Sequence, residues 1–350
     1  MNQRENMIRT IRFERPDFIP MMFHINAACW QHYDQNQLFD LMEAHPFLFP
    51  DFTRPQGHYR PEFARVARKD MPYTDDFGCV WQTTDDGITG TVIGHPLADW
   101  SQYEDYRFPE PETCSGIGPI DWSKIKQQVK RAKSEGRFTS GGLRHGHTFL
   151  QLSDLRGYQN LLYDMADDEP CLWDLIERLE AFNSSIIRHY VALEVDMVAY
   201  PEDLGMQNGP MLSPDYFRKY IKPSYQRLMK PARDSGLIVH MHSDGHLHDL
   251  IDDLIEGGVE VINLQDLVNG IDWITDRFAG KTCVDLDIDR QMITPFGTPQ
   301  QVDDLVRTEV TRIGRKEGGL MMTYGLYPGT PIANVKAMMD AMERYAFYYS

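Results

Sequence analysis

The second half of the chain alternates between two hydrophobic periods. Segments in which apolar residues recur every three or four positions predict helices over residues 169–193, 212–236, 246–258, 272–278, 298–315 and 330–347. Short apolar runs between them predict strands over residues 195–200, 237–242, 259–264, 282–288 and 319–325. Strands that alternate with helices in this way indicate a parallel sheet joined by right-handed crossovers.

Two of the predicted helices carry recognisable start signals. Ser213 is expected to cap a helix that has Pro214 in its first turn. Thr298 and Gln301 have the spacing of a capping box, and Pro299 lies between them. These signals support the helical interpretation of both segments.

The absence of glycine-rich phosphate-binding motifs helps to choose between two parallel α/β architectures. No GxGxxG or GxxxxGK[ST] sequence follows any of the predicted strands, which disfavours a nucleotide-binding doubly wound sheet. We therefore predict an α/β fold that consists of one (β/α)8 TIM barrel over residues 1–350. Residues 18–25 and 137–143 are the best candidates for further strands. Residues 46–120, which are rich in Pro, Asp and Trp, are expected to form long loops.

Composition limits the partners of the protein. The formal net charge of −17 and the pI of about 5.1 disfavour nucleic acid or an anionic membrane as the main partner. No long uncharged apolar run occurs, so we expect no membrane span and a cytoplasmic location. The 5 cysteines are widely spaced and form no CxxC pair, so reduced thiols are expected.

The densest candidate for chemistry is "HMHSDGHLH", residues 240–248. If residues 237–242 form a barrel strand, His240 and His242 share its inward face at the end where barrel enzymes keep their active sites. His242 and Asp244 then form an H-x-D pair able to hold a divalent ion. The alternative is that Asp244, or the serine before it, only caps the next helix. His246 and His248 are expected in the first turn of that helix, facing solvent.

Polar side chains also gather at the ends of the neighbouring predicted strands. Glu202 and Asp203 follow one strand, and Asp285, Asp287 and Asp289 alternate along another. Such a group of acids suggests a cation, a hydroxylated ligand or acid/base chemistry. The alternative for each acid is that it caps a helix or pairs with an arginine. Other side chains expected at the same end of the barrel are Arg144, His145, His147, Gln207, Asn208, Arg290 and Tyr324.

Several segments taken together carry a family resemblance, although each alone would be weak. They are "RENMIRTIRFERPDFIP" (4–20), "DDFGCVW" (75–81), "HPLADWSQYEDYRFPEP" (95–111), "LRGYQNLLYDM" (155–165), "LSPDYFRKYIKPSYQRLM" (212–229), "HSDG" (242–245) and "DIDRQMITPFGTPQQV" (287–302). With them the chain resembles the uroporphyrinogen decarboxylase superfamily along nearly its whole length. The resemblance implies a (β/α)8 barrel that is either a decarboxylase producing coproporphyrinogen or a cobalamin-linked methyltransferase.

Two departures from the family pattern bear on that choice. The decarboxylase branch carries an arginine-rich N-terminal loop that holds the substrate carboxylates, whereas residues 19–37 contain no arginine. The thiol-methylating members of the other branch hold zinc with an H-x-C pair and a later cysteine. This chain has His242-x-Asp244 in the first place and "TYGLYPGTP" (323–331) in the second, so both thiolates are absent.

Although the loss of both cysteines is the best sequence argument for a decarboxylase, the missing arginines favour a corrinoid-linked methyltransferase. It would move a methyl group between a small ether or amine and a cobalamin carried by a partner corrinoid protein. A metal site without sulfur is harder, and it suits direct polarisation of an oxygen- or nitrogen-bearing substrate. One alternative is a decarboxylase, a carboxy-lyase, acting on a smaller substrate, and this chemistry needs no metal in the family. Another is a barrel that binds a small molecule without turnover. A homodimer is a possible assembly.

The expected site residues fall into three groups. Zinc is expected at His242 and Asp244, with Glu202 as a further ligand. Asp287 and Asp203 are expected to orient the substrate or handle a proton, and His240 is expected to act one strand step deeper. The predicted substrate-binding side chains are Gln207, His147, Arg290 and Tyr324.

Overall fold

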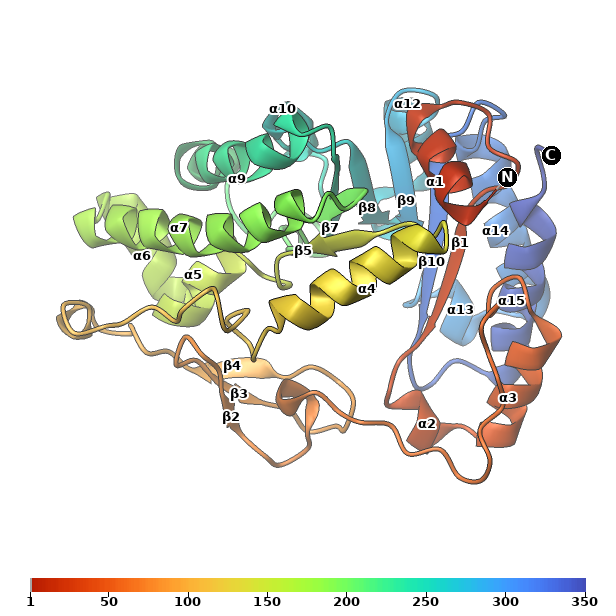
Figure 1. Cartoon of the computed structure of the whole chain (residues 1–350), viewed down its shortest axis with the longest axis horizontal. Helices are drawn as coiled ribbons and strands as arrows, with labels where there is room; N and C mark the ends of the chain where they lie inside the picture. The colour runs from red at the N-terminus through yellow and green to blue at the C-terminus, as the bar shows by residue number, and fades with distance from the viewer. Residues whose placement is uncertain (1) are drawn as a thin grey trace.

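Residues 2–350 are described by a computed structural model, which is built around a parallel sheet of seven strands (Figure 1). The sheet order is β1-β10-β9-β8-β7-β6-β5, so each strand from β5 to β10 lies beside the next one along the chain. The strands are β1 (Met21–Ile25), β5 (Ser140–Gly142), β6 (Met197–Ala199), β7 (Ile238–Ser243), β8 (Val261–Gln265), β9 (Cys283–Asp287) and β10 (Leu320–Leu326).

The sheet differs from the predicted (β/α)8 barrel in its closure. It is curled and parallel as expected, but β1 and β5 are its two edges and do not pair, so residues 2–350 form no closed eight-stranded barrel. The chain between these two edges instead forms a small antiparallel sheet with the order β2-β3-β4. Its strands are β2 (Tyr73–Thr74), β3 (Val80–Gln82) and β4 (Thr91–Gly94). Residues 46–120 are therefore not loops alone.

We call residues 66–117, which include this small sheet, the flap. In Figure 1 the β2–β4 sheet lies below the main sheet. Gly87 brings the flap close to the segment after β1, because a Cβ at this position would meet the backbone of Ala28 at 2.5 Å. Gly116, next to the ring of Phe77, and Gly90, next to the backbone of Gln82, allow close packing within the flap.

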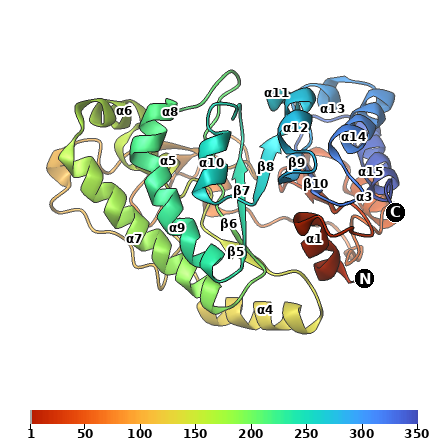
Figure 2. The same ribbon diagram turned by 90° about the horizontal axis from the view of Figure 1, so that it is seen from above.

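The helices lie around the main sheet (Figure 2). Those of the first half are α1 (Gln3–Arg12), α2 (Cys29–His32), α3 (Gln35–Ala44), α4 (Trp122–Ser134), α5 (Phe149–Arg156), α6 (Tyr158–Asp167) and α7 (Pro170–Ala192). Those of the second half are α8 (Pro214–Tyr216), α9 (Lys222–Asp234), α10 (Ile251–Gly257), α11 (Asp266–Asn269), α12 (Ile271–Phe278), α13 (Ile293–Phe296), α14 (Pro299–Ile313) and α15 (Ile332–Ala346). No helix of residues 2–350 is long and apolar enough to cross a membrane.

Most predicted elements of the second half are confirmed. The Ser213 side chain caps α8, and Thr298 and Gln301 form the expected capping box of α14. The predicted helix at residues 246–258 begins later than expected, at Ile251. Residues 245–250 are instead held by side chains from the next β/α unit, since the N–H groups of Gly245 and Leu247 donate to Gln265 and Asn269. This segment is a turn rather than the first turn of a helix.

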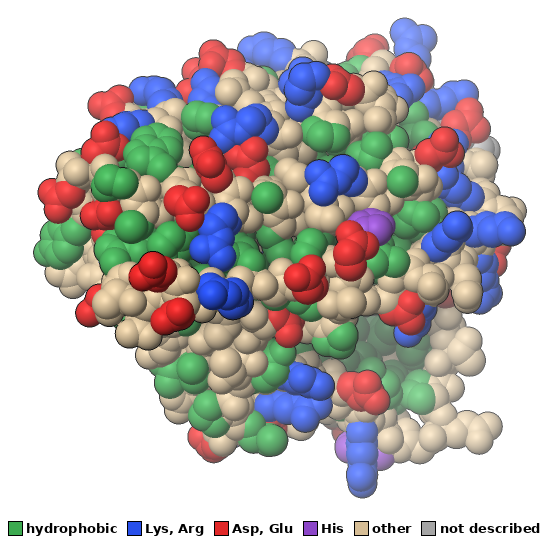
Figure 3. Space-filling view, turned by 60° about the vertical axis from the view of Figure 1, so that its left-hand side comes forward, with side chains coloured by type: hydrophobic (Ala, Val, Ile, Leu, Met, Phe, Trp, Pro, Cys, Tyr) green, Lys and Arg blue, Asp and Glu red, His purple; other side chains and the backbone are tan. Residues whose placement is uncertain are grey.

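The acidic side chains are distributed over the surface shown in Figure 3. On the face shown in Figure 3, Asp and Glu side chains are interspersed with Lys and Arg side chains. The net charge of −17 is therefore not concentrated there in a single patch.

Candidate active site

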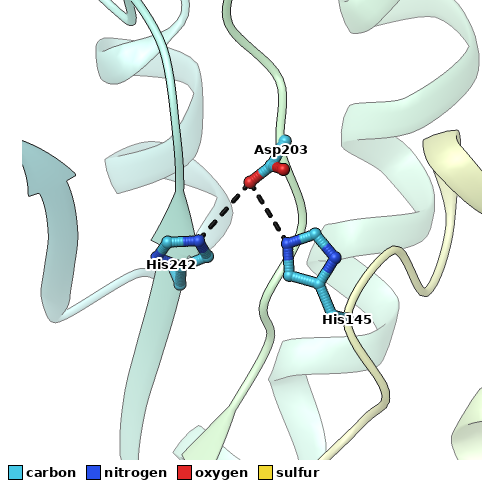
Figure 4. Close-up of side chains that lie close together, drawn as sticks. All are labelled: His145, Asp203 and His242. Carbon is cyan, nitrogen blue, oxygen red and sulfur yellow. Dashed lines mark hydrogen bonds and ion pairs between the residues drawn. The ribbon is translucent and has the colours of Figure 1, made fainter. Parts of the chain in front are cut away.

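Three side chains from neighbouring strand ends meet at the carboxyl end of the sheet (Figure 4). His145 follows β5, Asp203 follows β6, and His242 is near the end of β7. The Asp203 Oδ1 atom lies 3.2 Å from His145 Nε2 and 3.4 Å from His242 Nε2. One ligand atom from each side chain lies within 4.8 Å of the other two, which is close enough for one metal ion to bind all three.

Parallel pairing of β5, β6 and β7 explains why residues far apart in sequence converge here. Met197–Ala199 pairs with Ser140–Gly142 on one side and with Ile238–His240 on the other. The segments after these strands are also joined, because Gly146 N–H donates to Pro201 O and Glu202 N–H donates to His242 O. The cluster is therefore built on the sheet itself.

The electrostatics of this trio favour ionised groups. Burial raises the pKa of Asp203, but hydrogen bonds from His145 and His242 outweigh this effect and hold that pKa well below its usual value. Burial lowers the pKa of His242, but the hydrogen bond to Asp203 and the charge of Asp244 outweigh it, and the pKa rises to about 9. Without a metal, His242 is therefore an imidazolium ion at neutral pH. A metal ion would have to displace its proton.

The orientation of the His242 ring is fixed by a hydrogen bond on its Nδ1 side. Its Nδ1 atom makes a short hydrogen bond to the Asn263 side-chain oxygen, and Asn263 in turn donates to the backbone oxygen of Asp285. This bond directs Nε2 toward Asp203, which is the arrangement found for histidines that bind metals. Asp244 lies next to it, with Oδ1 at 3.8 Å from His242 Nε2. That oxygen is buried and accepts no hydrogen bond from residues 2–350, so it is available as a further ligand.

The trio opens into a cavity of about 950 Å³ between the sheet and the flap. The walls contributed by the flap are largely apolar and include Trp81, Val92 and Ile117. The opposite wall is charged, with Arg290 and Asp287 at and just after the end of β9. A cavity that combines an apolar wall with convergent polar groups is typical of a small-molecule site.

Asp287 and Arg290 form the second charged group of the cavity. Arg290 lies 2.6 Å from Asp287 and 3.5 Å from Asp244, which links this pair to the possible metal ligands. Burial raises the pKa of Asp287 to about 7, despite the opposing charge of Arg290. A carboxyl group with such a pKa can gain or lose a proton near neutrality, as general acid/base catalysis requires.

Comparison with known proteins identifies the family. The family model of uroporphyrinogen decarboxylase (URO-D) matches residues 77–345. The chain belongs to the uroporphyrinogen decarboxylase family. Among curated URO-D proteins, a uroporphyrinogen decarboxylase of Thermus thermophilus is 29% identical over 141 residues, which cover 39% of this chain and 38% of that protein. The uroporphyrinogen decarboxylase of Danio rerio is 25% identical over 148 residues, which cover 39% and 37%. The match thus spans less than two fifths of these relatives.

A solved structure extends the similarity to the whole fold. A methyltransferase from Methanosarcina mazei superposes with a TM-score of 0.62 over 99% of each chain. The two sequences are 15% identical, so this comparison concerns the URO-D fold and not the chemistry.

Several of the predicted site residues of this URO-D protein lie outside the cavity. Glu202 is fully buried and points away from the trio, because its carboxylate accepts hydrogen bonds from the N–H groups of Thr148 (2.8 Å) and Leu150 (2.9 Å) and from the Tyr225 hydroxyl. With its oxygens occupied in this way, Glu202 anchors the start of α5 and does not act as a metal ligand. Burial raises its pKa to about 7, although these hydrogen bonds oppose the shift.

Three predicted substrate-binding residues also lie apart from the cavity. His147 is buried behind it and bonded to Thr148, and burial lowers its pKa to about 3, so it is neutral. Gln207 is exposed on the loop after β6. Tyr324 is fully buried, with its ring 5.2 Å from that of Phe23. Of the four, Arg290 alone lines the cavity.

His240 and Asp285 lie one strand step deeper in the sheet than the trio, whereas Asp289 lies after the end of β9. His240 lies 3.0 Å from Asp285 and is not among the residues that line the cavity. Asp289 is a cap, since it accepts hydrogen bonds from the N–H groups of residues 291–294. The expected alternation along β9 is therefore present, but its three acids have three different environments.

His246 and His248 are half-buried and packed in a turn, contrary to the prediction that they face solvent. His248 stacks on Trp273 at 3.9 Å and lies 2.9 Å from the backbone oxygen of Asn269. The His246 ring lies 4.0 Å from that of His248. The reason is the late start of α10, which leaves both histidines in a turn that packs against the next β/α unit.

His145 is expected at this end of the sheet from the sequence, but the sequence predicts no role for it. Its signal was the same as that of His242, a histidine just after a predicted strand. Residues 137–143 were a weak strand prediction, so His145 and His147 could not be separated by the face they occupy. In the structure, His145 faces Asp203 and His147 faces the interior.

Proposed function

We propose that this URO-D protein is a corrinoid-linked methyltransferase that takes a methyl group from a small ether or amine. The proposal rests on the trio of His145, Asp203 and His242 at the carboxyl end of the sheet. Two imidazoles and carboxylates form a zinc donor set that leaves room for a substrate atom. Asp244 would complete the set, whereas Glu202, an expected ligand, is engaged elsewhere.

Zinc held there would supply Lewis acidity to the oxygen or nitrogen that bears the methyl group. The residues of the chain have other roles in this proposal. Asp287 would give a proton to the leaving atom of the donor, because its pKa of about 7 keeps a protonated fraction at neutral pH. Arg290 would hold the carboxyl groups of Asp287 and Asp244 in place through its two contacts. The apolar flap wall would exclude water from the remainder of the donor.

The test combines metal analysis with a methyl-transfer assay. The purified protein is expected to bind close to one zinc ion per chain and to methylate free cob(I)alamin with at least one of a panel of methyl ethers and methylamines. A protein that remains free of metal after incubation with zinc, and that methylates nothing, would refute the proposal.

A decarboxylase of a smaller substrate is the second candidate, because Arg144 also lines the cavity with Arg290 and because the curated relatives are decarboxylases. It predicts carbon dioxide release from a small carboxylic acid by metal-free protein. It also predicts no loss of activity after treatment with a chelator.

A further inference from the structure

The active-site cavity continues into a furrow along α2. Tyr327 lines both the cavity and a second hollow of about 480 Å³. Gln31 lines that hollow and a third one of about 1110 Å³, which extends to Trp30 and Tyr59. We call the second and third hollows together, from Tyr327 past Gln31 to Tyr59, the α2 furrow. The shared residues place the two hollows next to one another and next to the cavity.

The walls of the α2 furrow are fixed by hydrogen bonds. The Tyr33 hydroxyl donates to the backbone oxygen of Thr330 at 2.7 Å, which ties α2 to the segment after β10. The Gln35 amide donates to the backbone oxygens of Trp30 and Tyr59, both at 2.9 Å. The Trp30 and Tyr59 rings lie 4.9 Å apart. The furrow is therefore formed before any ligand arrives.

The charged side chains of the furrow balance one another, unlike those of the whole chain, whose net charge is −17. Its formally charged side chains are Arg54, Arg60 and Lys69 on the one hand and Asp34, Asp85 and Asp86 on the other. Exposed aromatic area is available beside them, since Tyr59 is 39% exposed. Such a surface suits a large ligand that combines flat apolar faces with many neutral polar groups, which is the chemistry of an amide-fringed corrin ring.

Methyl transfer by direct displacement requires a specific arrangement of donor and acceptor in the site. The acceptor must approach the methyl carbon from the side opposite the leaving atom. The trio that would hold the leaving atom follows β5 and β6 and lies near the end of β7, toward one end of the strand order. Tyr327 follows β10, which lies with β1 at the other end of that order. The α2 furrow therefore begins beside strands at the other end of the sheet order from the trio.

We infer that the α2 furrow receives the corrinoid that accepts the methyl group. This inference rests on the proposed function. In the transfer the bond between the methyl carbon and the donor oxygen or nitrogen breaks, and the donor atom keeps the electron pair and gains a proton. Cobalt(I) of the corrinoid supplies the electron pair of the new bond to carbon, so its formal oxidation state rises by two.

The test narrows the furrow at Gln31, an exposed residue shared by its two hollows. Gln31→Trp is compared with Gln37→Trp, which places the same bulk on an exposed position of α3 outside the furrow. Binding of hydroxocobalamin alone is measured by calorimetry. Gln31→Trp is expected to weaken it about tenfold or more, equivalent to about 1.4 kcal/mol. Gln37→Trp should stay within about twofold of wild type, and the zinc content of both variants should be unchanged.

Two measurements keep this inference separate from the proposed function. If no donor is demethylated but hydroxocobalamin binds and Gln31→Trp weakens the binding, the proposed function fails and the furrow remains a corrinoid site. If methyl transfer occurs and Gln31→Trp leaves both the KM for cob(I)alamin and hydroxocobalamin binding unchanged, the furrow assignment is wrong. A wild-type protein that binds no hydroxocobalamin also overturns it. A raised KM for the methyl donor alone would show that the furrow holds part of the donor instead.

Discussion

At the scale of single residues, the four histidines of the "HMHSDGHLH" segment have four different environments. His242 faces Asp203 in the cavity, and His240 lies one layer deeper beside Asp285. His246 and His248 stack on each other, and His248 also stacks on Trp273. The two-residue period of a strand was enough to pair His240 with His242. It carried no information about the turn that follows, whose contacts come from residues about 20 positions away.

Alanine substitutions at His242 and His248 should therefore separate metal binding from stability. His242→Ala is expected to remove most of the bound zinc and to lower methyl transfer by about 10² or more, because a ligand is lost. His248→Ala should leave zinc content and turnover within a few-fold. It should cost ~1–2 kcal/mol of stability through the lost hydrogen bond and ring stacking. Elemental analysis, the cobalamin assay and thermal melts measure the three effects. Equal losses of zinc in both variants would contradict the assignment.

Glu202 is expected to stabilise the metal site without binding the metal. Its carboxylate holds the N–H groups of Thr148 and Leu150, directly after the segment that carries His145. Glu202→Ala should cost ~1–3 kcal/mol, because it leaves buried donors without a partner. It should also weaken zinc binding, because His145 loses its support. Zinc titration at a temperature where the variant is folded measures the second effect. Tyr225→Phe, which removes one of the hydrogen bonds to Glu202, is expected to show a smaller effect in the same direction.

At the scale of secondary-structure elements, sequence patterns located strands and helices well where the local signal was strong. The capping box of α14 and the strands β7 to β10 lie where hydrophobic periodicity and cap residues predicted them. The signal was weak for β5, a strand of three residues that contains two glycines, and for the short strands of the flap. The start of α10 was misplaced because side chains from β8 and α11 hold the preceding turn.

The contact between α14 and α11 contains an interaction that no sequence pattern revealed. Glu309 of α14 is fully buried, and neither of its carboxylate oxygens has a partner among the described residues unless the group carries a proton. Burial raises the pKa of Glu309 well above its usual value, and the neighbouring charge of Asp266 adds to the shift. Burial likewise raises the pKa of Asp266, with a smaller opposing effect of the hydrogen bonds it makes. The two groups therefore share a proton in the interior.

This pair predicts a pH-dependent stability. A group whose pKa is higher in the folded protein contributes stability that is complete below its unfolded pKa of about 4.3 and is lost as the pH rises through the folded pKa. Glu309→Gln keeps a neutral donor at this place and removes that loss. The melting temperature of Glu309→Gln relative to wild type should therefore increase from about pH 5 to pH 8. The control is Glu177→Gln on the exposed side of α7, for which the difference should not change with pH.

At the scale of the whole molecule, the sequence predicted the class of fold and the end of the sheet that carries the site. It did not predict that the sheet stays open between β1 and β5, because closure depends on whether the chain between them adds a strand to an edge. That chain forms the flap, and the flap supplies the apolar wall of the cavity. The location of the trio could be predicted from three strand ends. Which of the side chains there face the cavity depended on packing between segments far apart in sequence.

The cavity is lined by more acidic than basic side chains. Four acids line it, namely Asp154, Asp203, Asp244 and Asp287, against two arginines, Arg144 and Arg290. Both arginines already face carboxylates, since Arg290 lies 2.6 Å from Asp287 and Arg144 lies 3.5 Å from Asp154. Residues 19–37 contain no lysine that could replace the missing arginines of the N-terminal loop. A tetrapyrrole with many carboxylates would find both arginines of the described cavity already paired with carboxylates. We therefore expect no decarboxylation of uroporphyrinogen, measured by porphyrin fluorescence after oxidation of the products. Turnover at rates typical of enzymes, on the order of 1–10³ per second, would contradict this prediction and favour the decarboxylase candidate.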